Sequence, residues 1–150
     1  MKERISALLA TVLYTGKLTK APGTLVSAIG AVIFYLFIPG EGTILLIICG
    51  ILTVIGIWSA AISEKKFGHD ASCITIDELT GMLACFLFIS TKNTLVLVIS
   101  GFIIFRIFDI FKPWPINKTQ NLAGGWGVMA DDLSAALVTN VLLRILLIFI

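Results

Sequence analysis

An arginine, an aspartate and a lysine interrupt the end of an apolar segment with the sequence FRIFDIFKPWPI, at residues 105–116. Arg106, Asp109 and Lys112 are spaced i, i+3, i+6, which places the three side chains on one side of a helix. Charged groups inside an apolar segment are costly and usually functional. Because guanidinium and ammonium groups donate to phosphate oxygens, this stretch predicts a phosphate site. The alternative is an ion pair that lets a helix end leave a bilayer.

Two further places in the chain carry a pair of adjacent carboxylates, Asp77 with Glu78 and Asp131 with Asp132. Several carboxylates brought together either hold protons or bind a cation. A hard divalent ion such as Mg²⁺ takes oxygen ligands from one or two carboxylates and keeps its other positions for water or phosphate. Neighbouring side chains on a helix point about 100° apart, so we expect that one helix cannot easily direct both members of a pair at one ion. Taken alone, such a pair is more often a solvated first turn of a helix than part of a metal site.

The composition is that of an integral membrane protein. The 150 residues are 58% hydrophobic and 13% charged, with a mean hydropathy of +1.05, which is too apolar for a soluble domain of this size. Residues 21–40 and 42–63 contain no charge, and each stretch is long enough to cross a ~30 Å hydrocarbon core.

A net charge of +2 gives no support to a nucleic-acid partner. No metal-ligand spacing links Cys49, Cys73 and Cys85, so we expect packing roles for them.

The hydrophobic periodicity predicts an all-α fold, a polytopic membrane bundle that forms a single domain over residues 1–150. At the N-terminus, Ile5, Leu8, Leu9, Val12 and Leu13 follow the spacing of one helical face, which indicates an amphipathic helix on the membrane surface. No small-residue cleavage site follows this helix, so we expect it in the mature protein. About five transmembrane or membrane-embedded helices then follow, at 24–38, 43–62, 74–90, 93–112 and 128–150, the first capped by Thr24.

The positive-inside rule orients this bundle and places the ionisable groups at one depth. From a helical rise of about 1.5 Å per residue, Asp77 and Arg106 lie about 20 Å from the outer ends of their helices, in a core of ~30 Å. The same count gives about 24 Å for Asp109 and about 27 Å for Asp132. A phosphate site at this depth, near the lipid headgroups on the cytoplasmic side, points to a phosphorylated lipid. The basic residues that define this side are Lys2, Arg4, Lys17, Lys20, Lys65, Lys66, Lys112 and Lys118.

Four motifs follow one another along the chain: APGT (21–24), HDASCITIDELTGM (69–82), FRIFDIFKPWPI (105–116) and GGWGVMADD (124–132). Together they resemble the phosphatidylglycerophosphatase A family over nearly the whole chain. The resemblance departs at residues 24–31, TLVSAIGA, which replaces the family's usual run marked by glycine and proline. The family's acidic and basic motif positions correspond to Asp70, Asp77, Glu78, Arg106, Asp109, Lys112, Asp131 and Asp132.

The resemblance implies a small Mg²⁺-dependent enzyme of the bacterial cytoplasmic (inner) membrane, with its active site facing the cytoplasm. Such an enzyme hydrolyses the terminal phosphomonoester of phosphatidylglycerophosphate and forms phosphatidylglycerol in phospholipid synthesis. In this interpretation Arg106 and Lys112 bind the phosphate, and His69 or Asp70 protonates the leaving glycerol oxygen. The expected Mg²⁺ ligands come from Asp77, Glu78, Asp109, Asp131 and Asp132.

Several alternatives stay open at the level of sequence. Direct attack by water and a phospho-aspartate intermediate are both compatible with these residues, and the number of metal ions, the acyl-chain preference and the oligomeric state are not indicated. One competing function is a small membrane transporter or channel subunit with a carboxylate-lined cation site. A cation path would need polar residues across the whole bilayer, whereas the outer halves of the middle predicted helices are almost wholly apolar. A second competitor is a different lipid phosphatase.

Overall fold

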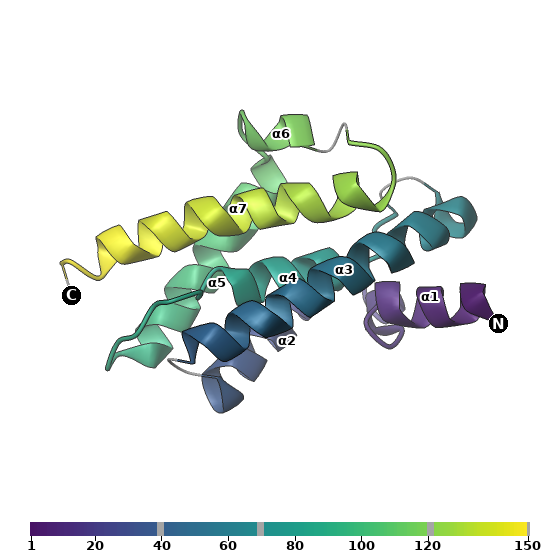
Figure 1. The fold of residues 1–150 in the computed structure, drawn as a ribbon. Helices are drawn as coiled ribbons and strands as arrows, with labels where there is room; N and C mark the ends of the chain where they lie inside the picture. The colour runs from purple at the N-terminus through teal and green to yellow at the C-terminus, as the bar shows by residue number, and fades with distance from the viewer. Residues whose placement is uncertain (39–40, 69–70, 120–121, 150) are drawn as a thin grey trace.

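The structure is a computed structural model that describes residues 1–38, 41–68, 71–119 and 122–149, and this part of the chain contains helices and turns but no strand (Figure 1). The all-α prediction is therefore confirmed. The elements in chain order are α1 (Lys2–Ala10), the short 3₁₀ helix η1 (Thr15–Lys17), α2 (Pro22–Phe37), α3 (Gly42–Phe67), α4 (Ile76–Ala84), α5 (Thr94–Phe111), α6 (Ile116–Thr119) and α7 (Gly125–Leu146).

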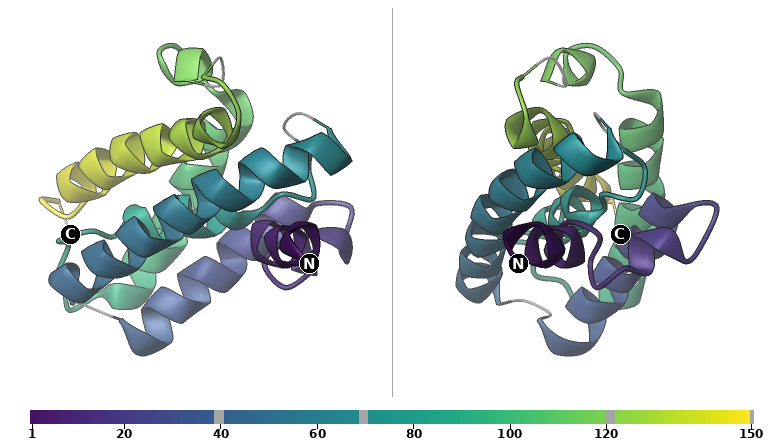
Figure 2. Two further views of the ribbon diagram at one scale, coloured as in Figure 1. Left: turned by 45° about the vertical axis from the view of Figure 1, so that its right-hand side comes forward. Right: turned by 90° about the vertical axis from the view of Figure 1, so that its right-hand side faces the viewer.

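The short helix α4 lies at the centre of the bundle. It packs against α2, α3 and α7, and α5 packs against α2 and α7. Its partners are longer, and α3 and α7 run past both of its ends in Figure 1. Figure 2 shows α1 beside the C-terminal end of α3, and α6 on the other side of the bundle, next to the start of α7. Side chains at the first turn of α4 can therefore meet residues from several helices.

Two helices in the described ranges, α3 and α5, are long and apolar enough to cross a membrane. The 16-residue helix α2 is apolar but shorter. Large apolar side chains such as Val54 on α3 and Ile103 on α5 are exposed on the outside of the bundle, as expected for a surface covered by lipid. Length and composition thus support two of the about five embedded helices that the sequence predicts.

Helix ends differ from the predicted ones where local residue chemistry outweighs the apolar pattern. Helix α3 continues through SEKKF to Phe67, five residues past its expected end, because Glu and Lys favour helix and lysines in a last turn interact well with the helix dipole. Gly68, with φ of +98°, then follows it. Helix α2 begins at Pro22, a residue suited to a first turn. The prediction that Thr24 caps this helix is wrong, since no side chain caps it and Thr24 lies within its first turn.

The amphipathic N-terminal helix is shorter than its hydrophobic pattern. Helix α1 ends at Ala10, and Val12, Leu13 and Tyr14 have positive φ values of 46°, 58° and 64°. The predicted face therefore stops before Val12 and Leu13. Thr11 stabilises the turn, because its Oγ1 accepts a hydrogen bond of 3.0 Å from the backbone N–H of Tyr14.

Helix α4 is about half as long as predicted. The apolar run over 74–90 forms a helix only from Ile76 to Ala84, and the chain then turns through Phe88, which has a φ of +55°. Irregular backbone inside an apolar bundle is tolerated only where other groups satisfy its hydrogen bonds.

Side chains from α7 supply these hydrogen bonds. Asn140 Nδ2 donates to the carbonyl oxygens of Cys85 (2.8 Å) and Leu87 (3.0 Å). Arg144 Nη2 donates to the carbonyl oxygens of Leu87 (2.9 Å) and Phe88 (3.2 Å). The end of α4 is thus fixed by residues more than fifty positions away in the chain, which local pattern analysis could not detect.

Candidate metal and phosphate site

Three carboxylates from two helices meet at the first turn of α4. Asp77 and Glu78 of α4 and Asp132 of α7 each offer one oxygen, and these oxygens lie within 4.8 Å of one another. The expectation that one helix cannot direct both Asp77 and Glu78 at one point is therefore wrong. Gly81 explains how α7 reaches them. It follows Asp77 by four residues and Glu78 by three, so it lies on the face between them, and an added Cβ would be 3.1 Å from the carbonyl oxygen of Asp132.

All three carboxylates are incompletely hydrogen bonded, and two of the three residues are buried. Asp77 is 7% exposed and Asp132 is 2% exposed. Among the described residues, Asp77 Oδ1, Glu78 Oε2 and Asp132 Oδ2 have no hydrogen-bond partner. Buried polar atoms without partners are rare and costly, and negative charges at this spacing repel one another. A bound cation would remove both costs, and an all-oxygen ligand set suits Mg²⁺.

The arginine of the charged motif lies beside α2, where Glu78 of the acidic cluster also approaches Gly23. Arg106 Nη1 forms an ion pair with Asp109 Oδ2, one turn later on α5. The same nitrogen donates to Ser27 Oγ of α2 at 3.4 Å. Arg106 Nε is buried and has no hydrogen-bond partner within the described ranges. The guanidinium is therefore held at one nitrogen and retains a donor for an anionic ligand.

The lysine of the charged motif binds a different partner. Lys112 is the C-cap of α5 and has a left-handed conformation, with φ of 41° and ψ of 58°. Its Nζ forms an ion pair with Asp131 Oδ2 of α7. The helical spacing that unites Arg106 with Asp109 therefore does not extend to Lys112. The adjacent aspartates of α7 diverge, with Asp131 directed at Lys112 and Asp132 at the acidic cluster.

The structure brings together seven of the nine predicted site residues, in three groups: the acidic cluster, the Arg106–Asp109 pair and the Lys112–Asp131 pair. His69 and Asp70 lie outside the described residues, so their roles stay predictions.

Gly23 and Ser27 of α2 also line the site, and the sequence analysis assigned them no role. Gly23 belongs to the APGT motif, which could have drawn attention to it, whereas nothing in the sequence distinguishes Ser27 from other helix serines. Both become recognisable only through their contacts with Arg106 and Glu78.

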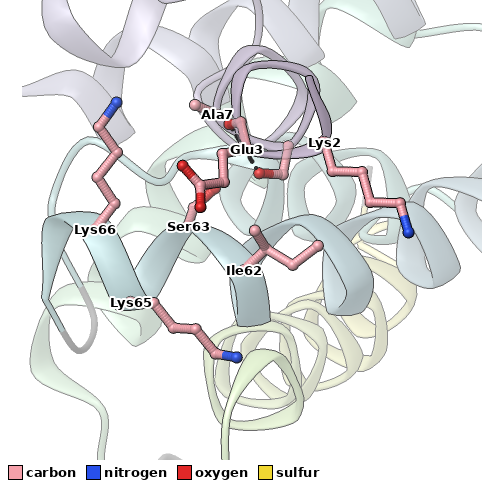
Figure 3. Close-up of a pocket in the computed structure, with 8 residues that line it drawn as sticks. Lys2, Glu3, Ala7, Ile62, Ser63, Lys65 and Lys66 are labelled. Carbon is pink, nitrogen blue, oxygen red and sulfur yellow. Dashed lines mark hydrogen bonds between the residues drawn. The ribbon is translucent and has the colours of Figure 1, made fainter.

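A separate pocket of about 520 Å³ lies between α1 and the C-terminal part of α3. Lys2, Lys65 and Lys66 line it, together with Glu3 and Ser63, and none of the three clustered carboxylates does. In Figure 3 the three ammonium groups point in different directions, and the carboxylate of Glu3 lies beside Ser63. The pocket therefore does not present converging positive charge, and we place the candidate site at the acidic cluster.

Comparison with known proteins gives a consistent family match. The family model described as Phosphatidylglycerophosphatase A matches residues 8–147. An Escherichia coli protein named Phosphatidylglycerophosphatase A is 36% identical, over 88% of this chain and 77% of the relative. A Haemophilus influenzae protein of the same name is 31% identical, over 87% and 81%. A Bacteroides thetaiotaomicron protein with the provisional name phosphatidylinositol-3-phosphatase is 33% identical, over 83% and 82%. No solved structure matches the chain.

Proposed function

The chain belongs to the phosphatidylglycerophosphatase A family and is a phosphatidylglycerophosphatase, and we propose that it acts with Mg²⁺ held by Asp77, Glu78 and Asp132. The observation that carries this proposal is the convergence of three carboxylates from two helices, each with a buried oxygen that lacks a partner among the described residues. Unmatched oxygens around one point are what an oxygen-ligand cation would require.

Two positively charged side chains, Arg106 and Lys112, would bind the phosphate. Phosphoryl transfer requires the protein mainly to position the phosphate and to stabilise the charge on its oxygens. Arg106 would donate from Nε, the donor that has no partner in the described structure, while Asp109 orients its guanidinium. Lys112, which is more exposed, would attract the phosphate as a point charge. A bound Mg²⁺ would supply Lewis-acid stabilisation to the phosphate oxygens.

Two residues that the sequence offered as metal ligands receive a different role. Asp109 is engaged with Arg106, and Asp131 with Lys112. A carboxylate that forms an ion pair with a partly buried arginine or lysine holds that side chain in place and offsets its charge. We therefore assign Asp109 and Asp131 the positioning of the two phosphate-binding cations. His69 or Asp70 remains the proposed proton donor to the leaving glycerol oxygen.

The location that we propose is the bacterial cytoplasmic membrane, with the site facing the cytoplasm. Both relatives named Phosphatidylglycerophosphatase A are bacterial, and α3 and α5 have the length and composition of membrane spans. Helices α2, α4 and α7 would complete about five embedded helices. Labelling of a single cysteine at Lys118→Cys in a cysteine-free background tests the orientation. A reagent that reaches this cysteine from outside intact cells would contradict the proposal.

The central experiment measures phosphate release from phosphatidylglycerophosphate in mixed micelles, with Mg²⁺ and with EDTA. We expect release only with Mg²⁺. Undiminished release after exhaustive chelation would contradict the metal assignment. Phosphatidylinositol 3-phosphate should be included, because one relative bears the name of a phosphatase for that lipid. If kcat/KM is higher for that lipid, the preferred substrate is a phosphatidylinositol phosphate, and the reaction type, hydrolysis of a lipid phosphomonoester, stays the same.

A further inference from the structure

We propose that Gly23 and Ser27 of α2 form a positioning surface for the active site, in which Ser27 fixes the guanidinium of Arg106 and Gly23 leaves the room that the carboxylate of Glu78 occupies. This inference rests on the proposed function and extends it to a helix that carries no charged residue. The two residues are four positions apart, so they lie on one face of α2.

Ser27 makes a hydrogen bond that differs from those of other helix hydroxyls in this protein. Thr53, Ser134 and Thr139 each donate to the backbone carbonyl four residues earlier on their own helix, the usual pattern for hydroxyls in helices. Ser27 is fully buried, and its Oγ accepts from Arg106 Nη1. The hydroxyl therefore joins two helices.

This contact determines how Arg106 can bind an anion. Nη1 has one acceptor on its own helix, Asp109, and one on α2, Ser27. Two acceptors in different directions restrict the rotation of the guanidinium plane. Nε is buried and has no partner among the described residues. Because the guanidinium is planar, fixing Nη1 also fixes the direction in which the N–H of Nε points. Without Ser27 the arginine keeps its charge but loses this second restraint.

Gly23 acts on the acidic cluster through space. A Cβ on Gly23 would overlap Glu78 Oε1, and it would lie 3.1 Å from Glu78 Cδ and 3.2 Å from Arg106 Nη1. Because the overlapping oxygen is at the end of a flexible side chain, Gly23→Ala would displace the carboxylate rather than unfold the helix. The displaced oxygen belongs to a residue of the proposed metal site. Gly23 therefore acts first on Glu78 of the proposed metal site, whereas Ser27 acts on Arg106.

The first test is a double-mutant cycle measured by phosphate release. We expect Ser27→Ala to lower kcat about five- to tenfold, with KM for the lipid nearly unchanged. In the Arg106→Lys background the same substitution should cause no further loss, because Ser27 acts through the guanidinium. Ser59→Ala is the matched control, since Ser59 is also fully buried and its 3.4 Å hydrogen bond ends on its own helix, at Gly56. Losses that multiply in the double variant would overturn the assignment.

A second readout does not depend on turnover. Phenylglyoxal modifies arginine, and mass spectrometry can follow the rate at Arg106. We expect Ser27→Ala to raise this rate several-fold and Ser59→Ala to leave it unchanged. Equal rates in all three proteins would overturn the role of Ser27. If the wild-type protein releases no phosphate, the proposed function fails, while the modification rates still decide whether Ser27 restrains Arg106.

The role of Gly23 is tested by metal binding. Mn²⁺ serves as a probe for Mg²⁺, and its binding can be followed by electron paramagnetic resonance without substrate. We expect Gly23→Ala to weaken Mn²⁺ binding about tenfold, as substitutions that disturb a metal ligand do. Gly50→Ala is the control, because a Cβ there meets no atom within 4 Å. Unchanged Mn²⁺ affinity in Gly23→Ala would overturn this part of the proposal.

Discussion

The two ends of the α4–α7 pair differ in whether their polar groups have hydrogen-bond partners. At the first turn of α4, oxygens of Asp77, Glu78 and Asp132 are buried without hydrogen-bond partners in the described structure. At the other end, Asn140 and Arg144 of α7 donate to the backbone carbonyls that follow α4, at 2.8–3.2 Å. Both ends belong to the same pair of packed helices. We therefore attribute the difference in hydrogen bonding to a functional role of the acidic end.

Polar groups that are hydrogen bonded to one another stabilise the fold, whereas buried polar groups without partners are places where a ligand or an ion can bind. The amide and guanidinium of α7 make the end of α4 rigid. Its first turn is thereby held against α7, with its carboxylates crowded together. We call the end with the three carboxylates the acidic end, and the end with Asn140 and Arg144 the capped end. We expect substitutions at the acidic end to reduce activity without loss of stability, and substitutions at the capped end to reduce stability.

The largest effect should follow removal of one negative charge from the acidic cluster. Asp77→Asn or Asp132→Asn is expected to lower kcat by at least about a hundredfold, because it removes a ligand and a charge that bind the metal. The thermal midpoint should stay the same or rise by about 2–4 °C, because the substitution relieves carboxylate repulsion. Phosphate release and thermal unfolding measure the two quantities.

Glu41→Gln is the control for this prediction, because Glu41 is an exposed carboxylate that precedes α3. A variant that keeps a near-normal rate would remove its residue from the ligand set. Loss of activity with unchanged Mn²⁺ affinity in both variants would contradict a shared metal site.

A smaller effect is expected at the arginine. Arg106→Lys keeps the positive charge but loses the planar fork, and kcat should fall about ten- to thirtyfold with little change in KM. Steady-state kinetics on phosphatidylglycerophosphate in mixed micelles measure both constants. Wild-type kinetics would show that Arg106 is only the structural partner of Asp109, and the charged motif would then be an ion pair at a helix end.

The capped end provides the opposite result. Asn140→Leu leaves the carbonyls of Cys85 and Leu87 with fewer donors and should lower stability by about 1–2 kcal/mol. Mn²⁺ affinity should change little, because the substitution is more than one helical turn from Asp132. Val141→Leu is the control, since Val141 is a neighbouring exposed residue of α7. A large loss of Mn²⁺ affinity at unchanged stability would remove the distinction between the two ends.

The smallest effect is expected at the lysine. Lys112→Ala should raise KM about three- to fivefold with a modest change in kcat, because a partly exposed ammonium contributes mainly attraction. Lys118→Ala, in the neighbouring helix α6, controls for the change in net charge. A fall in kcat as large as that of Arg106→Lys would mean that Lys112 contacts the phosphate in the transition state.

The sequence alone determined the features that depend on local composition and order. Charge-free apolar stretches identified α2 and α3, and α5 begins and ends within one residue of the expected helix. The four motifs indicated the family, and the residue types indicated phosphate and divalent-metal chemistry. These features follow from side-chain chemistry and helical periodicity, which neighbouring residues carry.

Only the tertiary structure decided which of these groups act together. The length of α4 depends on Asn140 and Arg144, and the separate directions of Asp131 and Asp132 depend on α4 and the C-cap of α5. The role of Ser27 depends on Arg106, 79 residues away. A single sequence contains no signal for such contacts, because they arise from how helices pack and not from any local pattern. Helix packing therefore divided one set of charges into a carboxylate cluster and two ion pairs.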